Sequence, residues 1–561
     1  MIKIRIMGKL KFFGLLIAAG MFAACSDNLE NPGNGGENTP STTEGYVKVA
    51  INMPSVSSTR AKDPTFADGD ANEYAVKSGI IAFFEGTTET NATFVKAYPM
   101  NNLVQIDDNN NTIDHVTTKV TQVLEAPLVT EGNKLYALVI LNNTGVASAS
   151  ATDGSLTLEN GETDIVLNST NNYTVAALNG NVEWNLTVSS VTNSTNGFLM
   201  LNAPLYNSST SQTLVPVTVY KTKQEADKST ATNIYVERIV AKVNINLPGT
   251  DGTLDVDDES VYVGDKVYFT TTTGETLGWK LNVTNKNTKP LRDVSEVATW
   301  ATYTETNQDF IGATAVEGSW VRIYWAKDNN YDATASDFNI LPQNNSEWGG
   351  YTTTTGGKTT TNAQYCLENT APFANNNNEN TTAVWIKAKY DFTGDGSYDD
   401  SFFIIDTEAG TYNETDFIGK MKEILGESSL TINSNAKGGY YNTEEEIASL
   451  FTESVTVTGD ELKRIGEIRY YKDGECYYYT QAIKHFGQDY KLGDDKTMTK
   501  YLGRYGVVRN NWYELTINSV SGPGEPEITP PDDEHVDDEE GYIKCTINVL
   551  SWAKRSQGVE L

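Results

Sequence analysis

Cysteine and histidine, the residues on which many active sites and metal centres depend, are scarce in this chain: 4 Cys and 3 His in 561 residues. The cysteines are Cys25, Cys366, Cys476 and Cys545. One belongs to the signal segment described below, and the remaining odd, scattered set argues against a disulfide framework. No zinc-ligand spacing, phosphate-binding loop, nucleophile elbow or Cys/His pair can be drawn. We therefore expect no enzyme, no cofactor and no metal centre.

Positively charged residues are also few compared with negatively charged ones. Lys and Arg together number 42 against 74 Asp and Glu, which gives a net charge of -32. A chain this acidic is not a general nucleic-acid binder. It fits an exported surface that must stay soluble. Beyond the first 25 residues, no apolar run is long enough to cross a bilayer.

Strand-forming residues are abundant, with 30 Tyr and 18 Phe, and 45 Gly supply turns between short segments. Buried or alternating strands are predicted at Tyr136–Leu141, Ile239–Leu247 and Val384–Tyr390. Ile468–Tyr471 and Cys476–Tyr479, on either side of Asp473-Gly474, predict a hairpin with a type I′ turn. The chain is therefore predicted to be mainly β.

Signals for helices are few. Thr443 with Glu446 forms a capping-box pattern, and Asp416–Leu425 is a second short amphipathic segment. We expect two β-sandwich domains with a few short helices, because 561 residues exceed the size of one typical domain. The boundary is placed at Leu247-Pro248-Gly249, where a strong strand ends and an acidic, Gly-rich segment begins.

The first 25 residues read as an export signal. A basic stretch precedes a short apolar core, and small residues then stand directly before Cys25. This ending resembles the bacterial lipoprotein signal, in which the cysteine is lipidated; ordinary cleavage beside an incidental cysteine is the alternative. Residues 26–43 are polar and predict a flexible tether.

One strand pattern occurs twice, near the two ends of the chain. Glu44–Asn52 reads EGYVKVAIN and Glu540–Asn548 reads EGYIKCTIN. Each alternates in the same phase, so each predicts a half-buried strand. The apolar faces are Val47, Val49, Ile51 and Met53 in the first copy, and Ile543, Cys545, Ile547 and Val549 in the second. Two near-equivalent strands suggest competition for one groove, which is typical of subunits that polymerise by strand exchange.

Two further segments flank these copies. Arg60-Ala61 lies in a polar loop after the first copy, where an exposed arginine is open to proteases; a solvated loop cation is the simpler interpretation. Residues 521–539 contain four prolines and a dense acidic block. They predict a linker that could extend about 60 Å and carry the second copy to a neighbour. Trp552 is the expected apolar anchor behind it.

The acidic turn Asp391–Asp400 is similar to a calcium loop, but Phe402 stands where an EF-hand needs Glu. A Gly-rich turn between two strands is favoured.

Several segments, in order, resemble the fimbrillins of type V pili, closest to a short-fimbria shaft subunit. They are Tyr46–Val49 through Arg60-Ala61, Lys134–Val139, Val236–Val240, Tyr365–Thr370, Val508–Tyr513, and the acidic linker before a last strand ending near Trp552. Gly252–Asn362 shows little to match.

The resemblance implies two transthyretin-like Greek-key β-sandwich domains, lipidation at Cys25 and cleavage between Arg60 and Ala61 by an arginine-specific surface protease. Cleavage would remove the first strand copy, and the second copy of another subunit would fill the opened groove as a donor strand. The implied partners are further copies of the chain, tip and anchor subunits, the protease, host or bacterial receptors, and the outer membrane through the lipid. The mature form is expected in an extracellular fimbria.

The corresponding segments are 1–25 signal, 26–60 removed tether and strand, 61–248 N-terminal domain, 249–520 C-terminal domain, and 521–561 linker and donor strand. Two alternatives stay open: an anchor or tip subunit that does not polymerise, and a surface lipoprotein that binds glycans.

Overall fold

A computed structural model describes the chain in twenty segments. These are residues 44–52, 66–67, 73, 75–101, 103, 119–180, 182–247, 252–257, 261–262, 264–269, 277–303, 310–332, 337–341, 348, 351–353, 359–361, 363–480, 482–486, 501–536 and 543–552.

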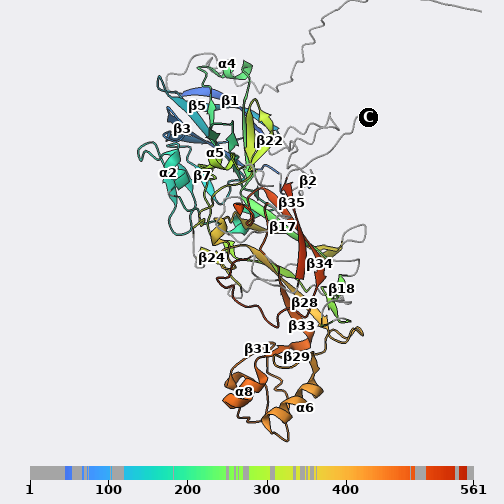
Figure 1. Ribbon diagram of the computed structural model, residues 1–561. Helices are drawn as coiled ribbons and strands as arrows, with labels where there is room; N and C mark the ends of the chain where they lie inside the picture. Colours follow the sequence, from blue (N-terminus) through green and yellow to red (C-terminus); the bar gives the residue numbers. More distant parts are fainter. Residues whose placement is uncertain are drawn as a thin grey trace, which may run out of the picture.

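The N-terminal part forms an eight-stranded sheet in which β1 is an interior strand (Figure 1). The order is β4-β3-β6-β12-β16-β1-β5, and β15 also pairs with β6. The strands are β1 (Glu44–Asn52), β3 (Gly79–Gly86), β4 (Thr93–Pro99), β5 (Lys119–Pro127), β6 (Lys134–Leu141), β12 (Met200–Asn202), β15 (Val215–Val217) and β16 (Thr232–Arg238).

This sheet encloses the first hydrophobic core, which contains the fully buried Phe83 of β3 and Trp184. In β6 every residue after Lys134 is buried, so the predicted buried strand at Tyr136–Leu141 is confirmed. Such a strand reads as a continuous apolar run because both of its faces are covered.

Smaller elements surround the first core. They are the strands β7 (Ala147–Ala149), β8 (Leu156–Leu158), β9 (Ile165–Leu167), β10 (Thr192–Asn193), β11 (Gly197–Phe198), β13 (Leu205–Tyr206) and β14 (Ser211–Gln212), and the helices α2 (Val175–Gly180), α3 (Val188–Val191) and α4 (Lys223–Lys228). β13 also pairs with β23 (Trp320–Ile323), which pairs with β22 (Ile311–Glu317) beside α5 (Val297–Trp300).

The second core lies between two sheets, as a β-sandwich requires. One sheet has the order β2-β35-β34-β17-β26-β25, with β27 also on β17; the other has the order β18-β19-β28-β20, with β33 also on β28. The first contains β2 (Phe66–Ala67), β35 (Ile543–Trp552), β34 (Asn511–Val520), β17 (Val240–Asn246), β26 (Thr359–Thr361), β25 (Tyr351–Thr353) and β27 (Gln364–Leu367). The second contains β18 (Thr253–Asp255), β19 (Lys266–Tyr268), β28 (Ala383–Asp391), β20 (Trp279–Asn282) and β33 (Glu475–Tyr479). β21 (Thr284–Asn285), β24 (Phe338–Asn339) and the 3-10 turn η2 (Phe373–Asn375) complete this region.

The predictions of a mainly β chain and of strands near residues 239–247 and 384–390 are confirmed by these sheets. The change of core differs in position from the expected boundary at residue 248. Val240 lies in the first core and Ala241 in the second, so the chain passes between cores where β16 leads into β17. The domain limits themselves stay predictions.

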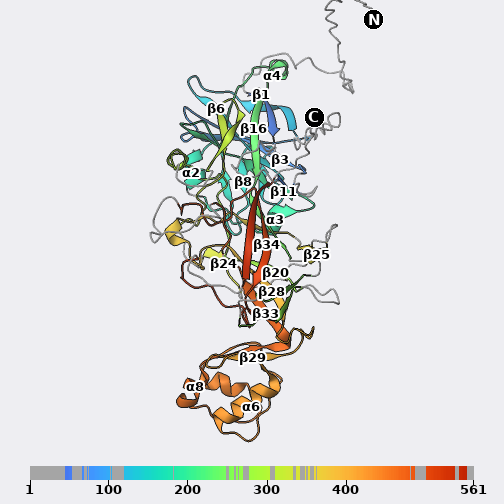
Figure 2. The same cartoon turned by 45° about the vertical axis from the view of Figure 1, so that its right-hand side comes forward.

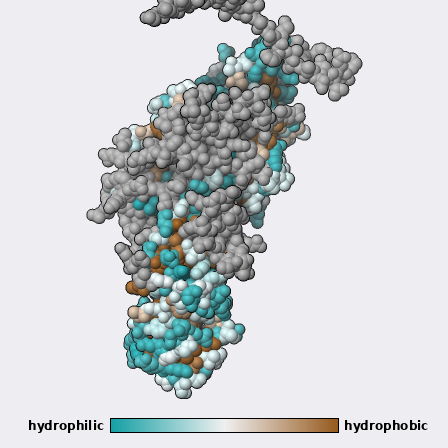
Figure 3. Space-filling model, turned by 90° about the vertical axis from the view of Figure 1, so that its right-hand side faces the viewer, coloured by the Kyte–Doolittle hydropathy of each residue, from teal (hydrophilic) through white to brown (hydrophobic). Residues whose placement is uncertain are grey.

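A third core, absent from the sequence prediction, lies at the end of the molecule far from β1 (Figures 1 and 2). We call residues 402–471 the end unit. It is inserted between β28 and β33, and consists of β29 (Phe402–Ile405), β30 (Tyr412–Asn413), β31 (Gly439–Tyr441), β32 (Ile468–Tyr471), α6 (Glu414–Leu425), α7 (Glu444–Ser449) and α8 (Gly459–Ile465). Stacked rings hold it together, with the Phe403 ring 3.9 Å from that of Phe417 and 4.5 Å from that of Tyr470. Its surface is mostly hydrophilic on the face shown in Figure 3.

Both predicted helices occur here. α7 begins at the Thr443/Glu446 capping box, and α6 covers the Asp416–Leu425 segment.

The predicted hairpin at Ile468–Tyr479 is wrong. Asp473 and Gly474, in the 3-10 turn η3 (Lys472–Gly474), do have the positive φ values, 53° and 66°, that a type I′ turn needs. However, β32 pairs with β29 and β31, whereas β33 pairs with β28. The left-handed pair therefore connects the end unit to the second core instead of closing a hairpin.

The extended linker predicted at 521–539 is also wrong for residues 521–536, which dock on the folded chain. Tyr471 and Tyr478 donate their hydroxyls to the carbonyls of Gly524 and Gly522, both at 2.8 Å. Glu525 forms a β-bridge with Tyr477, and burial raises the pKa of its carboxyl to about 6. The polar segment cannot bury surface by itself, but it pairs its backbone with groups that the core presents.

The Asp391–Asp400 turn links β28 to β29 and is organised by one buried carboxylate. Asp391 accepts hydrogen bonds from the backbone N–H groups of Thr393, Gly394 and Gly396 at 3.1, 2.8 and 2.7 Å. β28 and β29 do not pair with each other, so this turn also passes between sheets. Among the described residues, no group of three or more His, Cys, Asp or Glu side chains is placed to hold a metal ion.

We expect Asp391→Ala to lower the free energy of unfolding by about 2–3 kcal/mol, because buried N–H groups lose a charged acceptor. The exposed Asp395→Ala is the control. Denaturant unfolding with calcium and with chelator measures both effects. A wild-type stability that rises with calcium would contradict a purely structural turn.

Candidate strand-exchange site

β1 occupies a slot between β16 and β5. It runs parallel to β16, with Ile51 opposite Ile234, and antiparallel to β5 along its whole length. Val47 and Val49 are completely buried and Ile51 is 1% exposed, so the predicted inward face is confirmed for these three residues. Met53 lies outside the described residues. β1 is thus a core strand whose loss would open an apolar groove.

The polar residues of β1 are also held by specific partners. Glu44 forms an ion pair with Lys96 at 2.5 Å, which raises the pKa of the lysine through the hydrogen bond. Lys48 Nζ donates to the carbonyl oxygens of Asp227 and Ser229, at 2.6 and 3.2 Å, at the C-terminal end of α4. The slot therefore recognises both faces of its strand.

Glycine is required at one position of the slot. A Cβ on Gly45 would lie 2.4 Å from Val219 Cγ1 and 2.8 Å from the carbonyl oxygen of Tyr220. Backbone at 2.8 Å cannot move away cheaply, because Tyr46 and Tyr220 exchange two backbone hydrogen bonds of 2.8 Å there. The second copy of the repeat has Gly541 at the same position.

The described part of the second copy, which begins at Ile543, lies in a sheet of the second core of its own chain. β35 pairs antiparallel with β34, with Leu515 opposite Ile547, and parallel with β2, with Ala67 opposite Trp552. Ile543 is 4% exposed and Cys545 packs at the edge of the same core. Burial raises the pKa of Cys545 to about 12, in keeping with a small hydrophobic role. β1 and β35 thus each combine one antiparallel and one parallel neighbour.

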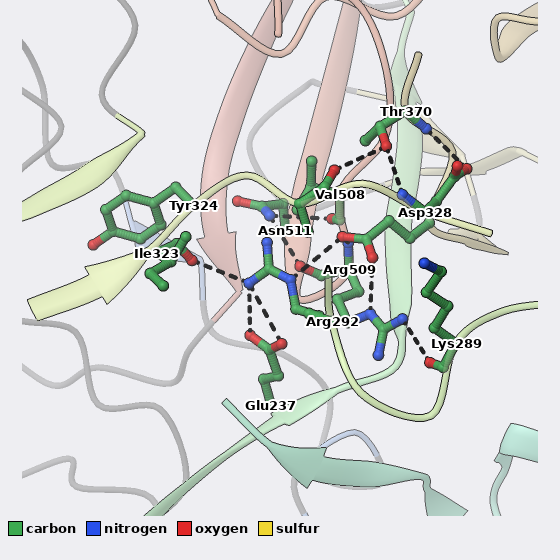
Figure 4. Close-up of polar contacts among 12 residues, drawn as sticks. Glu237, Lys289, Arg292, Ile323, Tyr324, Asp328, Thr370, Val508, Arg509 and Asn511 are labelled. Atoms are coloured by element: carbon green, nitrogen blue, oxygen red, sulfur yellow. Dashed lines mark hydrogen bonds and ion pairs between the residues drawn. The ribbon is translucent and has the colours of Figure 1, made fainter. Parts of the chain in front are cut away.

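A buried ionic cluster joins the strands that flank the two copies (Figure 4). Arg292 contacts Glu237 of β16 at 3.3 Å and Glu368 at 3.5 Å. Arg509, two residues before β34, contacts Glu368 at 3.2 Å and donates to Thr288 Oγ1 at 2.9 Å. These four charged side chains are at most 7% exposed. We call them the ionic junction.

A second buried pair lies beside the ionic junction. Lys242 of β17 pairs with Glu73 at 2.8 Å and lies 3.8 Å from the centre of the Trp512 ring. Arg238 donates to the Glu73 carbonyl oxygen at 2.6 Å, and burial lowers the pKa of this arginine to about 10. Lys242 is a charged residue in an alternating strand, yet it is 3% exposed because these partners enclose it.

Of the other residues singled out from the sequence, Cys25, Arg60 and Ala61 lie outside the described residues. The structure gives the register of Ile547, Val549 and Trp552 but describes nothing of their side chains. Cys366 and Cys476 are buried and free. Sequence reasoning missed the ionic junction, because charges far apart in the chain carry no local pattern. It also missed the significance of Gly45, although the repeated glycine was a usable signal.

The described part of the chain is mainly β, and its last strands lie in a region that matches a family model. Residues 469–558 match a family model described as "Major fimbrial subunit protein type IV, Fimbrillin, C-terminal". The resemblance to fimbrillins is thus confirmed over β33, β34 and β35. The matched proteins are structural subunits and not enzymes.

Solved structures resemble the chain loosely. A putative cell adhesion protein from Parabacteroides distasonis is 10% identical, with a TM-score of 0.39, covering 92% of this chain and 99% of that one. The tip fimbrial protein Mfa3 from Porphyromonas gingivalis is 10% identical, with a TM-score of 0.30 and coverages of 91% and 100%. The fimbrial anchor protein Mfa2 from the same organism is 7% identical, with a TM-score of 0.23 and coverages of 91% and 98%. A search of curated proteins found no match.

Within the described part of the chain, none of the helices is both long and apolar enough to cross a membrane.

Replacing Arg292 by alanine is expected to cost about 3–5 kcal/mol of folding free energy, because Glu237 and Glu368 would remain buried with their shared partner gone. Chemical denaturation measures this change. Lys463→Ala is the control, since this lysine is 80% exposed in an ion pair on α8 and should change little. Equal small effects of both substitutions would contradict a structural role for the ionic junction.

Proposed function

We propose that the chain is a shaft subunit of a bacterial surface fimbria that polymerises head to tail by donor-strand exchange. The observation that carries the proposal is the agreement between the β1 slot and the second copy of the repeat. The slot holds a glutamate, requires a glycine and accepts a lysine at positions 44, 45 and 48. The second copy has Glu540, Gly541 and Lys544 at the same spacing.

In this proposal, maturation opens the slot. Cys25 is lipidated during export to the outer membrane, and an arginine-specific protease then cuts between Arg60 and Ala61. The cut removes β1 but retains β2, because β2 begins at Phe66. The three side chains Val47, Val49 and Ile51 contribute about 4–9 kcal/mol through burial, so an empty slot is costly.

The donor strand must first leave its own sheet. β35 then loses β34 and the short β2, and in the slot of another subunit it gains β5 and β16. In both places β35 has one antiparallel and one parallel neighbour, so the hydrogen-bond ladders that it loses and gains are of the same kind. Removal of β1 therefore decides whether exchange is favourable. The contact is head to tail and does not close, and a filament results. The proposed building blocks are the mature domains 61–248 and 249–520 with the donor segment 521–561. Tip and anchor subunits are the proposed partners at the filament ends.

We expect Arg60→Ala to leave the subunit as a lipidated monomer that starts at Cys25, because β1 keeps its slot. The wild type should start at Ala61 and form multimers that resist detergent. N-terminal sequencing and intact mass of protein sheared from the cell surface measure both. A wild-type monomer that starts at Cys25 would indicate an anchor or another surface lipoprotein instead.

Gly541→Ala is expected to abolish polymers, because the new Cβ would meet the Tyr220 carbonyl in the slot of the next subunit. Gly419→Ala in α6 is the matched control, since its Cβ would meet no atom within 4 Å. Size-exclusion chromatography of cleaved protein reports assembly, and thermal unfolding checks that each monomer is folded. Normal polymers from a folded Gly541→Ala variant would overturn the donor role of the C-terminal strand.

A further inference from the structure

A pocket of about 490 Å³ opens where the first core meets β20 and β27. Its wall on the side of the first core comes from residues 186–189, at the start of α3. The opposite wall comes from the second core and its loops. The described residues that line it there are Lys280, Leu281, Thr284, Asn285, Lys286, Asn339, Leu341, Gln364 and Tyr365. Its volume is in the range of small-ligand sites, and such sites favour junctions between lobes.

The charge of this pocket is opposite to that of the protein. Its charged lining residues are Lys280 and Lys286, and none of the described lining residues is Asp or Glu. Two pockets of similar size, about 530 and 480 Å³, have carboxylates in their walls, among them Asp293 in the larger and Glu527 in the smaller. The charged groups in the described lining are therefore cationic in a chain of net charge -32, which favours an anionic ligand.

Lys280 is placed to interact strongly with such an anion. The residue is 6% exposed, and its Nζ lies 5.8 Å from the centre of the Trp348 ring. Burial lowers the pKa of this amine, so a negative ligand beside it would favour its charged form. Lys286 is exposed and flanks the same pocket.

The remaining lining residues offer neutral polar groups and apolar surface together. Hydroxyl and amide side chains come from Thr187, Ser189, Thr284, Asn339 and Gln364, and apolar side chains from Leu186, Leu281 and Leu341. Neighbouring groups hold the amides in place: Gln364 Nε2 donates to the Trp279 carbonyl at 2.7 Å, and Asn339 Nδ2 donates to the Thr284 carbonyl at 3.3 Å. A ligand with an anionic group, hydroxyl edges and an apolar face would use all three kinds of surface.

We propose that this pocket binds a carboxylate-bearing monosaccharide unit, of the uronic or sialic acid type. The carboxylate lies between Lys280 and Lys286, and the sugar hydroxyls contact the fixed amide and hydroxyl side chains. This site is independent of strand exchange, because none of the lining residues that the structure describes belongs to β1, β5, β16 or β35. Binding is therefore measured on the monomer, and its failure would leave the proposed assembly untouched.

The test uses the purified full chain with glucuronic acid and N-acetylneuraminic acid as probes, and the methyl ester of each as the uncharged control. Isothermal titration calorimetry or saturation-transfer NMR measures binding. Lys286→Gln removes one charge at an exposed position, and Lys280→Gln removes the other; Lys463→Gln on α8 is the matched control. Each pocket substitution should weaken binding about tenfold, the effect of losing one charged hydrogen bond.

Binding of either acid, weakened by Lys286→Gln but not by Lys463→Gln, supports the proposal, and the acid that binds more tightly identifies the type of sugar. The proposal is overturned if neither acid binds, if the methyl esters bind equally well, or if Lys463→Gln weakens binding as much. Because Lys280 is buried, Lys280→Gln could destabilise the fold, and its effect on binding is interpreted only when its thermal unfolding matches that of the wild type. Lys286→Gln keeps the test decisive in either case.

Discussion

The ionic junction is the interaction on which the arrangement of the two cores depends. Glu237 lies near the end of β16 and Arg509 two residues before β34. Arg292 and Glu368 connect the two through ion pairs. Charges taken out of water are costly unless each is paired, so the cluster tolerates only one relative placement of these strands. The backbone supports the same placement, because β16 leads into β17 and β17 pairs in parallel with β34. The groove around β1 and the strand that pairs with β35 are thereby fixed relative to each other.

The proposed assembly depends on this fixed arrangement both at the slot that receives a strand and at the strand that is donated. β16 forms one wall of the slot, and β34 carries the strand that would leave. The position of the end unit is compatible with this scheme, since its core is separate and lies away from β1. Residues 522–525 are docked on β33 and residues 532–536 on residues 373–378. For donation, only the terminal strand beyond them would need to move. In the proposed exchange, β1 and β35 would leave their sheets while the strands joined by the ionic junction keep their placement.

Local patterns in the sequence predicted strands and helix starts correctly where a short, fixed spacing of residues defines the element. The alternation of Val47, Val49 and Ile51 predicted their burial, and the Thr443/Glu446 capping box predicted the start of α7. The failures have a common physical cause, which is that partners come from distant parts of the chain. Asp473-Gly474 has the backbone of a hairpin turn, but nothing near it indicates that its two strands enter different sheets. The sequence of segment 521–536 predicts no structure, because its partners Tyr471 and Tyr478 lie on β32 and β33, outside the segment. The pocket lined by Lys280 and Lys286 is likewise assembled from segments separated by long stretches of sequence.

The antiparallel pairing of β34 with β35 has a mechanical consequence. Inter-strand hydrogen bonds in such a ladder lie across the strand axis. A force directed along the axis of β35, relative to β34, therefore loads all the bonds between Ile543 and Ser551 in shear, and they must break together instead of one after another. The same geometry holds for a strand beside β5, which is antiparallel along the whole of β1. In the proposed filament, tension would pass from subunit to subunit along strands that resist it collectively, which suits a fibre exposed to flow.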